Sequence, residues 1–284
     1  MEQLEASTPI RLQARFFGLK SLVTRTICHP LVGRALSATF RDRIPSRGGA
    51  MDTKSSAITP ALKAALFWRI YESAEIRFVR KYLRGNVDVI ELGSGLGVVS
   101  CQILGKLEPE SRLVCVEANP NLLKVLNKNL TQHSNGRQFK VVHGAIANPA
   151  GDESFVPLML ADDLTASCIG SDNGHNGSIQ VPALRLSNIL RSHHLNRGFA
   201  LVSDIEGAEV CFIEADEGVL CHCEQLIIEL HETAWRGASV SVDRLRNVLE
   251  QRHGFKLRDH YGPVCLFEKN SQRRRPASNL ARDN

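Results

Sequence analysis

A chain of 284 residues is long enough to bury one large hydrophobic core, or one such core with a small addition. Hydrophobic residues make up 43% of the chain and charged residues 23%, as in ordinary globular proteins, and no run of 18 apolar residues is present that could cross a membrane as a helix. The formal net charge of +5 lies wholly in residues 1–50, where eight Lys and Arg residues stand against three acidic ones.

Residues 1–58 form a basic segment without a clear period of apolar residues, and Pro45-Ser46-Arg47-Gly48-Gly49 predicts a turn within it. We expect no secretory signal, because the first residues contain no compact apolar run with a small-residue cleavage site. Three interpretations remain open: a cap packed on the following domain, a basic amphipathic helix in residues 1–50 on an anionic membrane surface, or an organelle transit peptide. We favour the cap.

The basic residues are not interleaved with aromatic ones and no nucleic-acid-binding motif occurs, so we expect no nucleic-acid partner. The eight cysteines include no CxxC pair. Cys221-His222-Cys223 is the one cluster typical of a metal site, but strand alternation would point its sulfurs one way and its imidazole the other. We predict no metal there, and free thiols in a reducing compartment, the cytoplasm.

From Thr59 the pattern becomes regular. Thr59-Pro60 predicts a helix start, with a hydroxyl cap and a proline in the first turn, and apolar residues continue at helical spacing to Leu83 before Gly85 ends the helix. Strands and helices then alternate. The predicted strands are 87–92, 112–117, 139–143, 200–204, 226–230, 255–260 and 264–269; the predicted helices are 96–106, 120–135, 187–194 and 240–253; the irregular stretch 145–198 also holds a hairpin near 154–158 and a strand near 179–186.

Strands that alternate with helices predict a parallel sheet with helices on both faces. The last two strands are joined by Tyr261-Gly262-Pro263, a turn too short for a parallel crossover, so they must be antiparallel. We therefore predict an α/β fold with a Rossmann-like, mostly parallel sheet and a C-terminal antiparallel hairpin. This domain spans residues 59–269, between the basic segment and a tail, 270–284, that we expect to be disordered.

The run Val89-Ile90-Glu91-Leu92-Gly93-Ser94-Gly95-Leu96-Gly97 is an apolar strand that ends in an acid and three alternating glycines. The next strand ends in Glu117, one βα unit later, where a carboxylate can accept both ribose hydroxyls of a nucleotide. This pattern is shared by NAD enzymes and S-adenosylmethionine enzymes. The latter are favoured by the position of Glu91, by G-x-G-x-G in place of G-x-G-x-x-G, and by the terminal hairpin.

Two segments carry a family resemblance. Glu91 to Gly97 and Val116-Glu117-Ala118-Asn119-Pro120 resemble the first two motifs of class I S-adenosylmethionine-dependent methyltransferases. Asp204-Ile205-Glu206-Gly207-Ala208-Glu209, followed by Ile227-Ile228-Glu229-Leu230-His231, resembles the FkbM family, in which a strand ending in D-x-E-G-x-E precedes a strand ending in E-x-H. The resemblance covers about residues 65–268. Ser203 stands where family members often have lysine, so the substrate's charge does not follow from it.

The resemblance implies a cofactor, S-adenosyl-L-methionine, and a set of residues around it. Tyr71, Glu72 and Glu75, on the helix before the first strand, could reach over the cofactor as a lid. The residues implied for the cofactor are Glu91 for its ammonium group, Gly93, Ser94, Gly95 and Gly97 for the homocysteine and ribose, Glu117 and Ala118 for the ribose, Gly144 and Ala145 beside the adenine, and Asp204 next to the methyl group.

Methylation of a hydroxyl also needs a base within hydrogen-bond reach. Asp204, Glu206, Glu229 and His231 follow neighbouring strands, and we favour Asp204 or His231 as the base, with Glu206 beside them. The predicted function is an FkbM-type O-methyltransferase acting on a small-molecule hydroxyl, such as a sugar or secondary metabolite.

Three alternatives remain. One is an NAD(P)-dependent oxidoreductase, although none of the three tyrosines lies in a YxxxK arrangement. Another is a non-catalytic protein that binds a membrane surface or a partner. Within the favoured function, Mg²⁺ or Ca²⁺ held by Asp204 and Glu229 is a further possibility, since such ions prefer oxygen ligands; we predict no metal.

Overall fold

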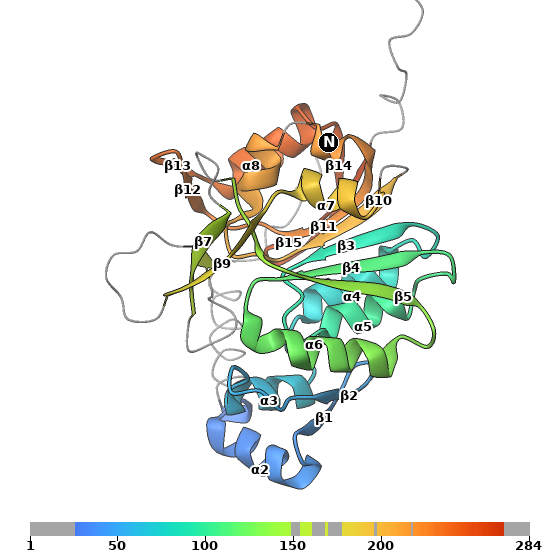
Figure 1. Ribbon diagram of the computed structural model, residues 1–284, viewed down its shortest axis with the longest axis vertical. Helices are drawn as coiled ribbons and strands as arrows, with labels where there is room; N and C mark the ends of the chain where they lie inside the picture. Colours follow the sequence, from blue (N-terminus) through green and yellow to red (C-terminus); the bar gives the residue numbers. More distant parts are fainter. Residues whose placement is uncertain are drawn as a thin grey trace, which may run out of the picture.

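The computed structural model describes residues 26–148, 154–160, 168–169, 178–195, 198–216 and 218–269. A sheet of seven strands, in the order β14-β15-β11-β10-β3-β4-β5, forms its centre (Figure 1). The strands from β11 to β5 are parallel, and β15 is antiparallel to both neighbours, so the predicted fold is confirmed. The strands are β3 (Asp88–Leu92), β4 (Arg112–Glu117), β5 (Gln138–His143), β10 (Phe199–Ser203), β11 (Cys223–Glu229), β14 (Phe255–Tyr261) and β15 (Val264–Lys269).

Helices cover both faces of the sheet, and alternate strand residues enter two separate cores. In β3, Val89 packs in the core that includes α4, α5 and α6, whereas Ile90 and Leu92 pack in the core that includes α7 and α8. Because both faces are buried, the central strands are apolar runs without polar alternation. The helices are α4 (Ser73–Tyr82), α5 (Val98–Leu104), α6 (Pro120–His133), α7 (Leu186–Ser192) and α8 (Val242–Gln251).

The helix predicted from Thr59 to Leu83 is broken in two, α3 (Pro60–Phe67) and α4. Thr59 caps the first as predicted, since its hydroxyl oxygen accepts a hydrogen bond of 3.2 Å from the Leu62 N–H. The break contains Arg69 and Glu72, whose φ angles of 60° and 48° are left-handed and end a right-handed helix. The two helices therefore meet at a corner.

The prediction of a hairpin near 154–158 is wrong, because these residues form a single strand. The strand β7 (Phe155–Met159) pairs antiparallel with the distant β9 (Ser178–Leu184). Together with β6 (Ala145–Ile146) and β8 (Cys168–Ile169) they form a second, four-stranded sheet. The turn-rich composition of this region predicted a local turn, whereas the pairing joins strands separated by about twenty residues, and most of that connection lies outside the described residues.

The described part of the basic segment packs against the domain. It contains α2 (Pro30–Phe40) and the hairpin β1 (Arg43–Ser46) and β2 (Gly49–Asp52). Ile44, Met51 and Ile58 are buried in the same core as α4, α5 and α6. The approach of α2 to α3 is so close that a Cβ on Gly33 would lie 1.6 Å from the Pro60 carbonyl oxygen.

The first 25 residues lie outside the described part of the chain, as does the tail 270–284, so the expected disorder of that tail and most of the expected membrane contact through residues 1–50 fall there. In the described part, no helix is both long and apolar enough to cross a membrane.

The buried side chain of Asn129 is one of the ties between the hairpin and the domain. Asn129 of α6 is fully buried; its amide oxygen accepts 2.7 Å from the Asp52 N–H, and its amide nitrogen donates to the carbonyls of Asp52 at 3.1 Å and Leu96 at 2.8 Å. Leu96 belongs to the glycine loop, so one residue joins the hairpin, α6 and that loop.

Replacing this amide should destabilise the protein. Asn129→Ala leaves buried N–H and C=O groups without partners, and we expect the free energy of unfolding in urea to fall by about 3 kcal/mol. The matched control is Asn127→Ala, an exposed residue of α6 whose amide bonds only its own helix, with an expected change under about 0.5 kcal/mol. Equal effects of the two variants would contradict the bridging role of Asn129.

Candidate active site

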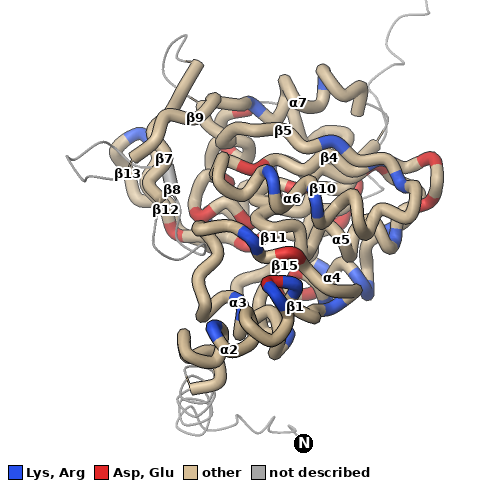
Figure 2. The backbone as a smooth tube through the Cα atoms, turned by 60° about the horizontal axis from the view of Figure 1, so that its bottom comes forward, with Lys and Arg blue, Asp and Glu red and all other residues tan. Residues whose placement is uncertain are grey.

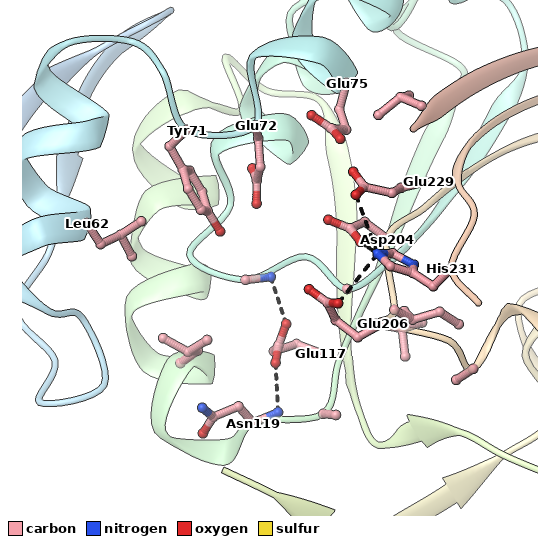
Figure 3. A pocket seen from close by; sticks show the side chains of 18 of the residues that line it. Leu62, Tyr71, Glu72, Glu75, Glu117, Asn119, Asp204, Glu206, Glu229 and His231 are labelled. Carbon is pink, nitrogen blue, oxygen red and sulfur yellow. Dashed lines mark hydrogen bonds and ion pairs between the residues drawn. The ribbon is translucent and has the colours of Figure 1, made fainter. Parts of the chain in front are cut away.

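A cavity of about 660 Å³ opens where β3, β4, β10 and β11 end at their carboxyl edge (Figure 3). After β3 the chain proceeds outward through β4 and β5, and then returns to place β10 on the other side of β3. Ligands of open α/β sheets bind at such a switch of strand order. The corner between α3 and α4 lies over the cavity and contributes Tyr71 to its wall, and α3 contributes Leu62.

The glycine loop forms one wall of this cavity. Gly93, Gly95 and Gly97 have φ angles of 82°, 53° and 92°, in the left-handed region that favours glycine. A Cβ on Gly93 would also lie 1.9 Å from the carbonyl oxygen of Asp204, so only glycine allows the loop to pack on the end of β10. Gly93 and Gly95 line the cavity, whereas Ser94 and Gly97 do not.

Glu117 is held rigidly at the end of β4. The N–H groups of Gly95 and Asn119 each donate 2.7 Å to one of its carboxylate oxygens. Burial raises its pKa to about 7, although these two hydrogen bonds oppose the rise. The side chain still lines the cavity, and so do Ala118, Gly144 and Ala145, the other residues that the resemblance implies around the ribose and adenine.

The position of Glu91 differs from its predicted role. Its carboxylate is 2% exposed and accepts hydrogen bonds from the Ser100 hydroxyl and, at 3.4 Å, from the Cys115 thiol. Burial raises its pKa to about 7. Glu91 does not line the cavity. The structure therefore places it apart from the other residues expected at the cofactor, although the resemblance implies that it contacts the ammonium group. The strand explains this, because Glu91 shares the face of Val89, which packs beneath α5.

Asp204 follows β10 and faces the cavity. Its Oδ1 is buried and accepts no hydrogen bond from any residue that the structure describes. Burial, and then the nearby carboxylates of Glu229 and Glu206, raise its pKa to about 7. Asp204 therefore changes charge near neutral pH, as a general base should.

His231 lies among four carboxylates. Its Nδ1 is 3.3 Å from Glu209, and its Nε2 is 3.4 Å from Glu206, 3.4 Å from Glu229 and 3.9 Å from Asp204. Hydrogen bonds to Glu209 and Glu229 raise its pKa to about 11, so the imidazole is doubly protonated at neutral pH. An imidazolium has no lone pair with which to accept a proton. Of the two groups predicted as the base, the structure favours Asp204 over His231.

Glu209 and Glu206 hold this histidine in different ways. Glu209 is fully buried, and its carboxylate also accepts hydrogen bonds from the N–H groups of Ile205 at 3.1 Å and Gly207 at 2.9 Å. It therefore fixes the turn after β10 and orients the imidazole. Glu206, at a left-handed φ of 52°, lines the cavity and faces the other ring nitrogen.

Sequence reasoning placed Glu75 only in a possible lid. In the structure it lies on α4, lines the cavity and shares a hydrogen bond with Glu229, while burial raises its pKa to about 8. Two carboxyl groups can bond to each other only through a proton, so Glu75 carries that proton at neutral pH. No local motif marks this pair, because the two residues are about 150 positions apart.

A family model described as the methyltransferase FkbM domain matches residues 98–257, more than half of the sequence. The chain belongs to the FkbM methyltransferase family. Its cofactor is therefore S-adenosyl-L-methionine rather than NAD(P), and it is an enzyme rather than a non-catalytic binding protein. No curated protein matches this FkbM methyltransferase.

Solved structures resemble the FkbM methyltransferase distantly. A putative tRNA (m1A22) methyltransferase from Streptococcus pneumoniae is 12% identical over 68% of each chain, with a TM-score of 0.39. A putative rRNA methylase from Clostridium thermocellum is 9% identical, over 69% of this chain and 93% of its own, with a TM-score of 0.41. Precorrin-6y C5,15-methyltransferase from Geobacter metallireducens is 14% identical, over 70% and 86%, with a TM-score of 0.35.

The cavity of this FkbM methyltransferase fits its cofactor chemically, because it combines exposed loop backbone at Gly93 and Gly95 with a fixed carboxylate at Glu117.

Two sets of described side chains also lie close enough to share a metal ion: Asp204 with Glu206 and His231, and Asp204 with Glu75 and Glu229. In the first set, the protonated ring of His231 offers no lone pair to a metal.

The raised pKa of His231 has a consequence for stability. An unfolded histidine titrates near 6.5, so the folded methyltransferase binds this proton more tightly than the unfolded chain does. The stabilisation is complete below pH 6.5 and is lost as the pH rises towards 11. We expect His231→Gln to lower the free energy of unfolding by roughly 3 kcal/mol at pH 6 and by clearly less at pH 9.5, measured by urea denaturation.

The control for this experiment is His222→Gln, an exposed histidine away from the cavity, which should change stability little at either pH. A loss for His231→Gln that is the same at both pH values would show that the imidazole is not held as a cation.

Proposed function

We propose that this FkbM methyltransferase transfers the methyl group of S-adenosyl-L-methionine to a hydroxyl of a small molecule, such as a sugar or secondary metabolite, with Asp204 as the general base. The observation that carries this proposal is the position of Asp204. It has a buried carboxylate oxygen that accepts no hydrogen bond from the described residues, a pKa near 7, and a place on the same cavity wall as the glycine loop.

The residues of the cofactor end have distinct roles in this proposal. Glu117 receives the ribose hydroxyls with the lone pairs that Gly95 and Asn119 leave free. Ala118, Gly144 and Ala145 border the adenine, and Gly144 suits that place because a Cβ there would meet Leu184 at 2.6 Å. The bound cofactor supplies an activated methyl group, and the protein's main task is to hold the acceptor in line with it.

Asp204 removes the proton as the hydroxyl attacks. A pKa near 7 leaves a useful fraction of the carboxylate ionised at neutral pH, while its proton affinity stays high enough for transfer. His231 supports the ionised form, because its positive charge lies 3.9 Å from Asp204 and lowers the pKa that burial raises. Glu206 contributes by balancing the charge of His231 from the cavity side.

The lining of the cavity favours a small acceptor without negative charge. Among the described lining residues none is Lys or Arg, while Glu72, Glu75, Asp204, Glu206 and Glu229 all face it. Phosphate groups of nucleic acids are bound by Lys and Arg, which among the described residues in the view of Figure 2 are spread over several elements. A neutral polyol fits this lining, and nucleic acid does not.

The cell compartment is also part of the proposal. The seven cysteines whose side chains the structure describes, all except Cys168, are free. Free thiols persist in the reducing cytoplasm, so we place the enzyme there.

Binding of the cofactor product is the first test. Calorimetric titration with S-adenosylhomocysteine should give a dissociation constant on the order of micromolar, typical of enzyme ligands. Glu117→Ala should abolish measurable binding, since the ribose hydroxyls and the Gly95 N–H both lose their partner. NAD⁺ serves as the control ligand and should not bind; binding of NAD⁺ in place of S-adenosylhomocysteine would overturn the proposal.

The role of Asp204 is tested with an acceptor found by screening hydroxyl compounds with methyl-labelled cofactor. Asp204→Asn should lower kcat by ~10²–10⁴-fold, with S-adenosylhomocysteine affinity unchanged within threefold. The wild-type rate should rise with pH through about 7 as the carboxylate loses its proton. The control is Glu232→Gln, an exposed acid next to His231. A kcat of Asp204→Asn within threefold of wild type would exclude Asp204 as the base.

A further inference from the structure

We propose that Glu72, at the corner between α3 and α4, binds the ammonium group at the amino-acid end of the cofactor, the role that the sequence motif assigns to Glu91. The inference rests on the proposed cofactor site. It adds a specificity-determining residue that lies outside the glycine loop and outside the matched family range.

An anionic partner for the ammonium must face the cavity beside the glycine loop. Glu91 does not satisfy this requirement, because its carboxylate is engaged by Ser100 and Cys115 and is covered from the cavity. Glu72 satisfies it. Its side chain lines the cavity and points from the corner toward the loop, on the opposite side from Glu117 (Figure 3).

Distances to the loop place Glu72 over Gly95. A Cβ built on Gly95 would lie 3.7 Å from Glu72 Oε1 and 3.3 Å from the Tyr71 hydroxyl oxygen. The N–H of the same glycine donates to Glu117. Gly95 therefore separates the carboxylate proposed for the ribose from the carboxylate proposed for the ammonium, in the order in which these groups follow each other along the cofactor.

The backbone at Glu72 is arranged for this purpose rather than for the helix that follows. Glu72 is the N-cap residue of α4, yet its side chain makes no capping hydrogen bond. Its φ of 48° lies in the left-handed region, which is uncommon for a residue with a long side chain. Such conformations cluster at ligand sites, where the surrounding structure maintains them. Here the conformation directs the carboxylate into the cavity.

The carboxylate of Glu72 also has no positive partner. No ion pair to Glu72 forms within the described residues, and the hydroxyl of Tyr71 is its hydrogen-bond donor. Burial and the nearby acids Glu75, Glu91 and Asp204 hold its pKa well above the usual range. A ligand cation at this point would supply the missing charge and favour the ionised carboxylate.

The test compares two ligands that differ only at the amino-acid end. S-adenosylhomocysteine carries the ammonium group, whereas 5′-methylthioadenosine keeps the adenine, ribose and sulfur and lacks it. Glu72→Gln should weaken binding of S-adenosylhomocysteine about ten- to hundredfold in calorimetric titration, as expected for the loss of a charge-assisted hydrogen bond, and should change binding of methylthioadenosine less than twofold.

Two further variants make the comparison decisive. Glu117→Gln should weaken both ligands, and Glu91→Gln, checked for an unchanged melting temperature, should not discriminate between them. Equal weakening of both ligands by Glu72→Gln, or discrimination by Glu91→Gln in its place, would overturn the assignment to Glu72 alone. If wild-type protein bound neither ligand, the cofactor site itself would be refuted, and this assignment with it.

Discussion

At the carboxyl edge of the sheet, many carboxyl groups lie close together with little positive charge to balance them. This imbalance determines the protonation states of the groups in the site. A carboxylate removed from water is costly unless hydrogen bonds or a cation compensate for it. In the described residues, the one cationic side chain on the cavity wall is His231. The carboxyl groups on or directly behind that wall are Glu72, Glu75, Glu91, Glu117, Asp204, Glu206, Glu209 and Glu229.

The way each acid is compensated separates structural from ligand-binding roles. Glu209 and Glu91 are satisfied entirely by the protein, one by backbone N–H groups and His231, the other by a hydroxyl and a thiol. Glu117 is fixed by two N–H groups but still faces the cavity. Asp204 keeps a buried oxygen that accepts no hydrogen bond from the described residues, with the His231 imidazolium 3.9 Å away, and Glu72 has no cation beside it within the described residues. Groups left in this state favour a ligand that brings hydrogen-bond donors or positive charge.

Sequence reasoning reached the sheet and the loop because their signals are local. Continuous apolar runs, a three-glycine loop and a short turn before β15 each depend on neighbouring residues, and Glu117 follows from a fixed spacing. The corner at Arg69 and Glu72 left no such signal, since left-handed φ angles occur there without glycine or proline. The burial of Glu91 was recoverable from strand alternation, which places it on the face of Val89.

The protonation of His231 was beyond any local pattern. Its four carboxylates come from two separate segments, and the pKa depends on their distances in the folded chain. The sequence motifs D-x-E-G-x-E and E-x-H are compatible with a neutral histidine that acts as a base and equally with a histidine that stays protonated. The charge of His231 depends on how the turn after β10 packs against the end of β11. Glu209 holds that turn through two backbone N–H groups and also contacts the imidazole ring.

The residues that line the cavity fall partly inside and partly outside the range that the family model matches. The family match spans 98–257, which includes Glu117, Asp204, Glu229 and His231. Leu62, Tyr71, Glu72 and Glu75 lie before that range and belong to α3, α4 and their corner, while Val264 lies after it. Gly93 and Gly95 of the glycine loop also lie before that range. The matched range therefore holds the carboxylates and the imidazole at the ends of β4, β10 and β11, whereas the loop and the covering wall come from residues before it. Because α3, α4 and their corner form the covering wall, they contribute to the size and charge of the space beside those carboxylates and that imidazole.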